Sequence, residues 1–416
     1  MFKPHYLVWA LFLSFVFHSA LSCAEEMQHE DILTSDSTLT LHDLVEKSLP
    51  NYPNSQLLNA KKQELKARQI HAKGLLPAAP SIMLRNQNDQ LLSSNGESEW
   101  ELGVELPIWL SGQRKAREAI ANASLQNLNS HTQNIRLQLA GMVRDALWEI
   151  QLMQGLADIA KNKYEATSQL QQDIEKRVKL GDMAQKDLLV AQTDTLQAES
   201  EKIYAEAEVQ HAKFRYTNLT GLKVIPAEFT EAKSNKSELD ETHPALVEAN
   251  DKIVLSEQRS NLTKIESRDN PTVIIGTRSL RGASDTQFNN SLGITLRIPL
   301  QMESRNAPLL AAAEVQNAEQ QANLSQLKQL LAAAMHEAEH NFEVGLTQLE
   351  VLTKQNSIAH QSLKVTRKAF QLGELDLSDL MRVQTQAFNA DRSLKNQQTQ
   401  QLWNTARFNQ AVGELP

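Results

Sequence analysis

The sequence predicts a mainly α protein with a small β portion, in which long helical hairpins form coiled coils and one pattern occurs twice. A stretch with a Leu-Gly-acid turn between two helical segments appears at 176–199 and again at 368–391, an offset of 192 (368 − 176). Small and apolar residues recur at heptad spacing through long segments. Only 14 glycines and 12 prolines occur in 416 residues, which is typical of long helices.

The internal repeat extends beyond this stretch. Four further pairs of residues share an offset of 190 or 191, namely Pro53 with Pro244, Pro80 with Pro271, Gly103 with Gly293, and Arg114 with Arg305. Four independent pairs whose offsets agree to within one residue indicate a duplicated architecture. We therefore expect two homologous halves, 40–225 and 241–416, joined by a linker at 226–240.

The N-terminus has the features of a secretory signal peptide, expected at residues 1–24. Lys3 precedes an apolar run at 6–17 that is too short to span a bilayer, and small residues precede a cleavage site after Ala24. The single cysteine, Cys23, is an alternative site of lipid attachment, although the residues before it fit a lipoprotein signal poorly. The polar segment 25–39 is expected to be flexible.

Each half is expected to contain two strands followed by two long helices. In the first half, a helical segment at 40–76 is interrupted around Pro50–Pro53, and strands at about 80–91 and 99–109 precede helices at about 115–180 and 185–220. In the second half, strands at about 271–281 and 288–300 precede helices at about 305–372 and 377–412. A helix of about 65 residues is roughly 100 Å long.

The strands alternate apolar and polar residues as a membrane barrel strand does. In the first half, apolar residues from Trp100 to Ile108 alternate with Glu101, Gly103 and Glu105, and the second half repeats the pattern around Arg297. We expect Glu101, Glu105 and Arg297 to face a barrel lumen. A soluble sheet with one wet face is the alternative for a single strand, but the signal peptide and the repeated pattern favour the barrel.

Both the strands and the helices indicate oligomerisation. Four strands per chain leave two sheet edges, whose unpaired amides and carbonyls are costly in hydrocarbon, so the sheet must close with copies of itself. Two chains give eight strands and three give twelve, and counting does not choose between them. The Ala-rich helix seams bury little area each and need several neighbours.

A zinc-protease motif, HExxH, occurs at His336–His340 on a predicted helix. The matching positions in the first half are Asp145 and Glu149, so the repeat twin carries no such site. We therefore interpret His336 and His340 as part of a solvated helix face and expect no metal site, catalytic residue or cofactor. A net charge of −8 without a basic stripe gives no support for nucleic-acid binding.

The half-repeat pattern, the motif LPIWLSGQRKAR at 106–117 and the two Gly-acid turns resemble the TolC-like outer-membrane efflux ducts, nearest the cobalt–zinc–cadmium resistance branch. The resemblance covers nearly the whole chain after the signal peptide. It implies a homotrimer with a 12-stranded barrel in the outer membrane of a Gram-negative bacterium and a periplasmic α-barrel. It also implies a periplasmic adaptor (membrane fusion) protein and an inner-membrane pump of the resistance-nodulation-division type as partners.

In the family the Gly-acid turns close the duct at its periplasmic end and meet the adaptor. Carried over to this chain, the resemblance assigns this role to the residues of the two turns, namely Leu180, Gly181, Asp182, Leu372, Gly373 and Glu374. Asp376 and Asp379 would add further rings of acidic groups if their side chains point inward. The glycines suit the left-handed position that ends a helix. For Asp376 and Asp379 the alternative is helix capping, with Asp376 as N-cap and Asp379 three residues on.

The sequence is thus interpreted as a passive, gated conduit that exports small solutes, with divalent heavy-metal cations as the expected substrate. Within transport, the alternatives are a type I secretion duct and a multidrug efflux duct. Two alternatives belong to other classes: a zinc hydrolase built on His336 and His340, and a periplasmic coiled-coil protein that forms no channel.

Overall fold

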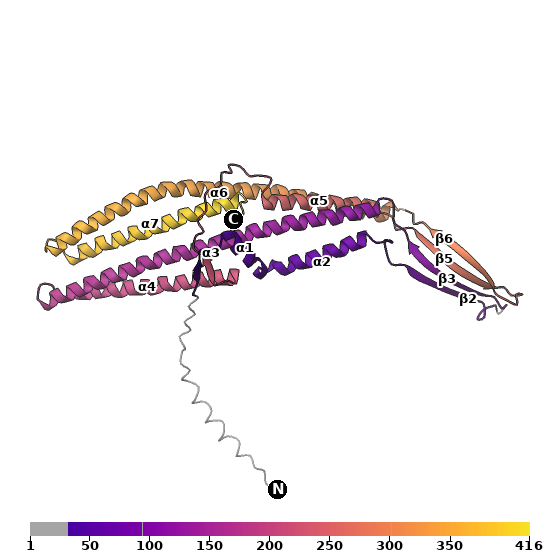
Figure 1. The fold of residues 1–416 in the computed structure, drawn as a ribbon, viewed down its shortest axis with the longest axis horizontal. Helices are drawn as coiled ribbons and strands as arrows, with labels where there is room; N and C mark the ends of the chain where they lie inside the picture. The colour runs from indigo at the N-terminus through magenta and orange to yellow at the C-terminus, as the bar shows by residue number, and fades with distance from the viewer. Residues whose placement is uncertain (1–31, 94, 301) are drawn as a thin grey trace, which may run out of the picture.

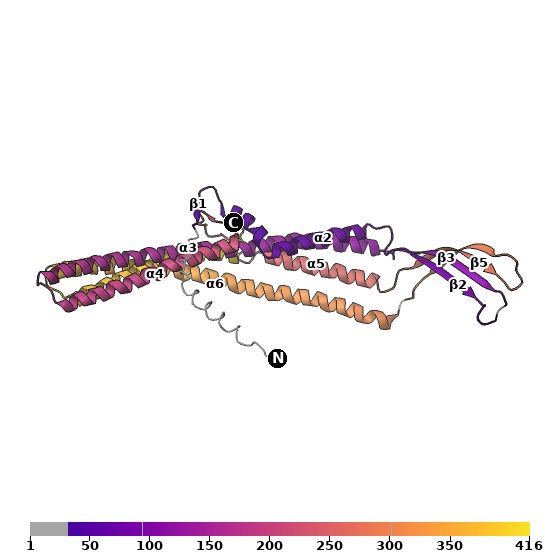
Figure 2. The ribbon, with the colours of Figure 1, turned by 90° about the horizontal axis from the view of Figure 1, so that it is seen from below.

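The computed structural model describes residues 32–93, 95–300 and 302–416. The expected signal peptide and Cys23 lie outside the described residues. The molecule is strongly elongated, with a four-stranded sheet at one end and the turns of two helical hairpins at the other (Figure 1). A second view shows the same long axis, with α6 diverging from α5 toward the sheet (Figure 2).

The N-terminal part is helical after a short strand. Helix α1 (Leu41–Ser48) begins with a capping box between Thr40 and Asp43, the 3-10 turn η1 (Leu49–Asn51) contains Pro50, and α2 spans Asn54–Ala72. The prolines therefore interrupt the helix where the sequence predicted. The described part of the segment 25–39, which the sequence predicted to be flexible, contains a short strand and a buried side chain. Strand β1 (Thr34–Asp36) pairs in parallel with β4 (Val224–Pro226), and Leu39 is buried.

The main sheet contains β2 (Ser81–Asn88), β3 (Ser98–Pro107), β5 (Thr272–Arg281) and β6 (Asn289–Arg297). Its order is β2-β3-β5-β6 and every neighbouring pair is antiparallel. The β3–β5 pairing joins segments that the sequence placed in different halves. The predicted strands overlap the observed ones, which are shorter by up to three residues at an end.

Two long hairpins form the rest. Helix α3 (Gln113–Lys179) has 67 residues and returns as α4 (Gln185–Thr220), while α6 (Glu303–Gln371) has 69 residues and returns as α7 (Leu377–Ala411). These bounds lie within two residues of the predicted ones. At 1.5 Å per residue, α3 is about 100 Å long. Helix α5 (Pro244–Ile265), which the predicted boundaries did not separate, begins with His243 as N-cap and Pro244 in its first turn.

Residues at heptad spacing form the core of the first hairpin. Leu139, Val143 and Ile150 on α3 pack with Ala212 and Tyr216 on α4 in one buried cluster. These side chains form the buried seam between the two helices of the hairpin. The helices lie side by side in the order α2-α3-α5-α6 near the sheet and α4-α3-α7-α6 near the tips.

The segment expected as a linker, 226–240, packs closely on the helices. Glu231 accepts two hydrogen bonds from the buried guanidinium of Arg144 on α3, at 2.6 and 2.8 Å. Phe229 packs edge-on against the Trp148 ring. Lys233 lies over the rings of Phe342 and Phe408, which belong to α6 and α7. This segment therefore ties both hairpins together at mid-length.

Candidate functional site

The two hairpin tips contain the residues that the sequence placed at a gate. After α3, the amide of Gly181 donates to the carbonyl of Val178 (3.0 Å) and that of Asp182 to Arg177 (2.9 Å). After α6, Gly373 and Glu374 make the equivalent bonds to Phe370 (3.1 Å) and Ala369 (3.0 Å). These paired bonds define a Schellman motif, which needs a left-handed residue, and the φ values of the glycines are 84° and 75°.

The tip side chains point largely into solvent. Leu180 and Leu372 are 77% and 66% exposed, and the carboxylates of Asp182 and Glu374 are exposed without a hydrogen-bond or ion-pair partner in the described chain. Asp376 caps α7 by accepting from the amide of Asp379 at 2.8 Å. The capping alternative is therefore correct for Asp376.

The side chain of Asp379, in the first turn of α7, also has a local partner. It accepts from Arg382 at 2.7 Å, which makes a second interaction within the same helix. The tip acids thus fall into two kinds: two with partners on α7, and two, Asp182 and Glu374, that face water.

The structure brings the two tips together at one end of the molecule. Ile174 of α3, Phe370 of α6 and Leu380 of α7 share one buried cluster, and the guanidinium of Arg177 lies 5.2 Å from the Phe370 ring centroid. The tip of each hairpin is therefore positioned by apolar contact with the other.

At the opposite end, the sheet has one apolar and one charged face. On β3, Trp100, Leu102 and Val104 are 43–53% exposed, while Glu101 and Glu105 occupy the alternate positions. The register places Arg297 on the side of Glu105, with 4.0 Å between their charged atoms. The three residues predicted to share a face therefore share it.

Two more arginines lie on that face, and the sequence reading overlooked both. Arg85 on β2 and Arg278 on β5 are the register partners of Glu101 on either side. The signal was weak because β2 and β5 alternate less cleanly than β3. The two arginines could be placed on the charged face only from the register of the strands, which cannot be read from the sequence.

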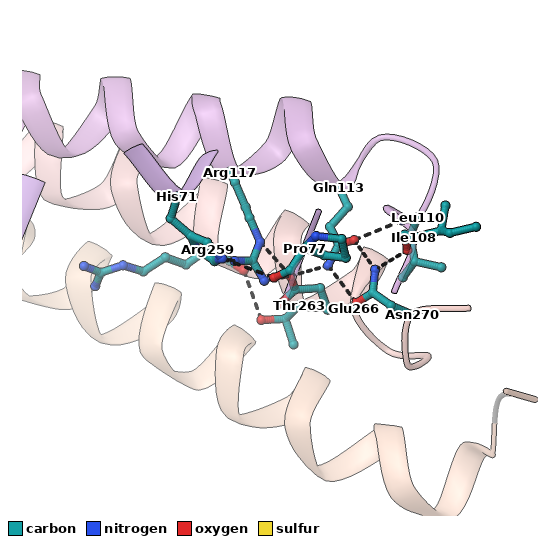
Figure 3. A network of polar contacts seen from close by, with 10 residues as sticks. All are labelled: His71, Pro77, Ile108, Leu110, Gln113, Arg117, Arg259, Thr263, Glu266 and Asn270. Carbon is teal, nitrogen blue, oxygen red and sulfur yellow. Dashed lines mark hydrogen bonds and ion pairs between the residues drawn. The ribbon is translucent and has the colours of Figure 1, made fainter. Parts of the chain in front are cut away.

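A polar network fastens the sheet to the helices (Figure 3). Arg117 on α3 donates to Glu266 after α5 at 2.6 and 3.0 Å, and its guanidinium lies 5.4 Å from the Trp109 ring centroid. Gln113 donates to Glu266 at 2.7 Å, and Asn270 donates to the side chain of Gln113 at 2.6 Å. Trp109, Gln113 and Arg117 all belong to the motif LPIWLSGQRKAR. The motif therefore orients the sheet, a role its pattern alone did not reveal.

A buried carboxylate lies between α3 and α5. The side chain of Glu248 is 4% exposed and accepts hydrogen bonds from His131 (2.9 Å), Asn134 (2.6 Å) and Lys252 (2.6 Å). Burial opposes its ionisation, but these donors outweigh that effect and lower the pKa of Glu248 to about 2. The cluster borders a cavity of about 830 Å³ and keeps Glu248 charged there.

The HExxH residues form no such cluster. His336 and His340 are exposed on α6, and Glu337 borders the same cavity as Glu248. Within the described residues, no group of three or more His, Cys, Asp or Glu side chains is placed to hold a metal ion. Two imidazoles on one helix turn do not by themselves make the closed coordination of a zinc site.

None of the described helices combines the length and the apolar character needed to cross a membrane.

No family model and no curated protein matches the chain. Solved structures do match. The outer membrane protein VceC of Vibrio cholerae has a TM-score of 0.72 at 15% identity, covering 90% of this chain and 96% of that one. The Campylobacter jejuni CmeC outer membrane channel has 0.72 at 11%, covering 90% and 85%.

CusC, whose structures concern folding and transmembrane channel formation, has a TM-score of 0.70 at 15% identity, covering 92% of this chain and 93% of that one. The likeness spans nearly the full length of all three structures. At these identities it shows the fold: the chain has the architecture of outer-membrane channel proteins. The TM-scores of 0.72, 0.70 and 0.72 do not single out one of the three structures, so the heavy-metal branch stays a prediction.

Proposed function

We propose that this chain is the outer-membrane duct of a tripartite efflux system, a passive conduit that catalyses no reaction. The observation that carries the proposal is a pair of unlike open edges along the whole molecule. One edge consists of β2, α2 and α4, and the other of β6 and α6. Within residues 32–93, 95–300 and 302–416, neither edge has a further strand or helix packed along its outer side.

The helical edges expose apolar stripes at heptad spacing. On α6, Val351, Ile358 and Val365 are 59%, 68% and 66% exposed. On α4, Leu189, Leu196 and Ile203 are 56%, 66% and 60% exposed. Stripes with a period of seven are coiled-coil seams, and these two have no partner helix within the described chain. A second copy supplies one, since α6 of one chain meets α4 of the next.

The sheet edges require the same arrangement. Strands β2 and β6 leave backbone amides and carbonyls unpaired, which hydrocarbon does not tolerate. Because the two edges differ, the contact is head-to-tail, and such contacts generate rings when the rotation closes. Closure would pair β2 with β6 of the next copy and make a barrel with a helical tunnel below it. We infer three copies and twelve strands, on the resemblance to TolC-like ducts.

The remaining assignments follow from the same resemblance. The apolar sheet face contacts outer-membrane lipid, and the tips lie in the periplasm of a Gram-negative cell after removal of the signal peptide. There the exposed turns around Gly181 and Gly373 meet an adaptor protein that links the duct to a resistance-nodulation-division pump. Divalent heavy-metal cations are the proposed substrate. The near-equal lengths of α3 and α6, 67 and 69 residues, support a duplicated origin of the halves.

Conductance across a planar bilayer tests the proposal. Purified full chain, added in detergent to one side, should produce discrete and lasting conductance steps. A variant carrying Val351→Asp and Ile358→Asp is the control, because it keeps the sheet but lacks the α6 stripe, and it should produce none. A folded, membrane-inserted wild-type chain without conductance steps would refute the duct.

A further inference from the structure

The charged face of the sheet carries equal numbers of acids and bases. On this face the four described strands place three carboxylates, Glu99, Glu101 and Glu105, and three guanidiniums, Arg85, Arg278 and Arg297. The remaining strand arginine, Arg281, belongs to the opposite face and lies 5.2 Å from the Phe288 ring centroid. The face is therefore electrically neutral in each chain.

Each carboxylate also lies within 4.0 Å of a guanidinium on another strand: for Glu99 and Glu101 on an adjacent strand, and for Glu105 on β6, one strand beyond β5. Arg278 donates to both oxygens of Glu99, at 2.5 and 3.0 Å, and lies 3.9 Å from Glu101. Arg85 approaches Glu101 from the other side at 3.7 Å. Glu105 lies 4.0 Å from Arg297 and accepts from the hydroxyl of Ser81 at 3.0 Å. Every acid is thus paired across a strand boundary.

Ion pairs of this kind affect the electric field in the lumen more than they affect the folding stability of the chain. The partners are 16–63% exposed, and exposed ion pairs contribute about 1 kcal/mol or less each. In a water-filled lumen, however, a close pair acts as a dipole, whose field falls faster with distance than that of a single charge and is screened within about 8–10 Å. The register further aligns Gly103, Gly276 and Gly293, so this level of the face presents bare backbone on three strands.

We propose that the sheet segment of the duct is charge-balanced and does not select solutes by charge, with Arg85, Arg278 and Arg297 as the residues that cancel the lumen carboxylates. This inference rests on the proposed duct function. It holds for any number of copies, because the balance is complete within one chain. Charge selection then belongs to another part of the tunnel, and divalent cations meet no free strand carboxylate here.

The pair formed by Arg85 and Glu101 allows a matched test. The ratio of K⁺ to Cl⁻ permeability is measured from the reversal potential of reconstituted channels in a KCl gradient. Glu101→Gln should lower this ratio about two- to threefold and Arg85→Gln should raise it by a similar factor, since a ring of single charges produces a potential of the order of kT. The double variant should return to the wild-type ratio.

Some outcomes would overturn the inference. If Arg85→Gln has no effect while Glu101→Gln and the double variant both lower the ratio, Glu101 acts as an unpaired cation-attracting group. The pair of Arg297→Gln and Glu105→Gln repeats the test where the first variants fail to assemble. Absence of conductance in wild type refutes the duct itself and the inference with it. Conducting channels with unequal shifts refute the charge balance alone.

Discussion

At the scale of single residues, the tips separate into groups that hold the backbone and groups that face water. Gly181 and Gly373 occupy left-handed positions, and Asp376 caps α7, so these residues build the turns. Asp182 and Glu374 are exposed. The sequence allowed the glycines and the cap to be predicted, because their chemistry is local. It left the direction of the acids open, since that depends on neighbouring copies.

Removal of the exposed tip acids should alter ion flow and not folding. Three copies would place six carboxylates, from Asp182 and Glu374, around one tunnel end, where like charges repel unless cations or basic partners compensate. The double variant Asp182→Ala with Glu374→Ala should therefore show higher conductance and weaker cation preference in planar bilayers. Unchanged conductance and selectivity would show that these acids are solvated turn residues and place the gate elsewhere.

Substitution at the tip glycine should act through backbone strain. A Cβ at Gly373 meets no atom within 4 Å, but φ is +75°, which costs a side chain about 1 kcal/mol or more. Gly373→Val should lower the unfolding free energy by about that amount and weaken adaptor docking. Gly293→Ala is the control, because its Cβ also meets open space and its φ is not positive. Equal stability of both variants would contradict the strain argument.

The pH dependence of stability should reflect Glu248. Its pKa is lowered from 4.5 to about 2 in the folded chain, against the opposing effect of burial, by donors from His131, Lys252 and Asn134. A lowered folded pKa adds stability above pH 4.5 that is lost as the pH falls through 2. Wild type should therefore lose about 3 kcal/mol more than Glu248→Gln between about pH 5 and 2.

Chemical denaturation in detergent across this pH series measures that difference. Glu241→Gln, which removes an exposed acid paired with Lys328, is the matched control and should follow the wild-type profile. Parallel pH profiles for wild type and Glu248→Gln would show that the buried cluster contributes no such stability.

At the scale of elements, periodicity predicted most of what the structure shows. The heptad pattern of the first half, together with the internal repeat, placed α3, α4, α6 and α7 within two residues of their observed ends, because a long helix repeats its signal many times. Strands repeat it only a few times, so β2 and β5 were less distinct and their arginines were overlooked. The short strand β1 was missed, since it pairs with β4, whose residues lie 190 positions further along the chain (224 − 34).

The α6 stripe yields the prediction at this scale. Val351→Asp and Ile358→Asp place charges at two exposed heptad positions that we assign to the contact with α4 of the next copy. Burial of each side chain is worth about 1.5–3 kcal/mol, so the double variant should fail to assemble while keeping its helical circular dichroism. Ser357→Asp, exposed on the same turn of α6, is the control and should assemble. Normal assembly of the double variant would place the interface elsewhere.

At the scale of the whole molecule, the open edges decide the interpretation. The two edges, β2 with α2 and α4 and β6 with α6, are unlike surfaces on opposite sides of the chain. The sequence predicted the sheet edges by counting strands, but the helical edges required knowledge of which helices are neighbours. Copy number is set by the curvature that each interface imposes, and neither strand count nor heptad spacing encodes it.

The mass of the purified particle tests the central proposal most directly. Mature protein extracted in detergent should have the mass of three chains by native mass spectrometry or light scattering, and heating should dissociate it. Three copies would give the twelve strands that the resemblance to TolC-like ducts implies. A stable single chain that stays soluble without detergent would contradict the duct.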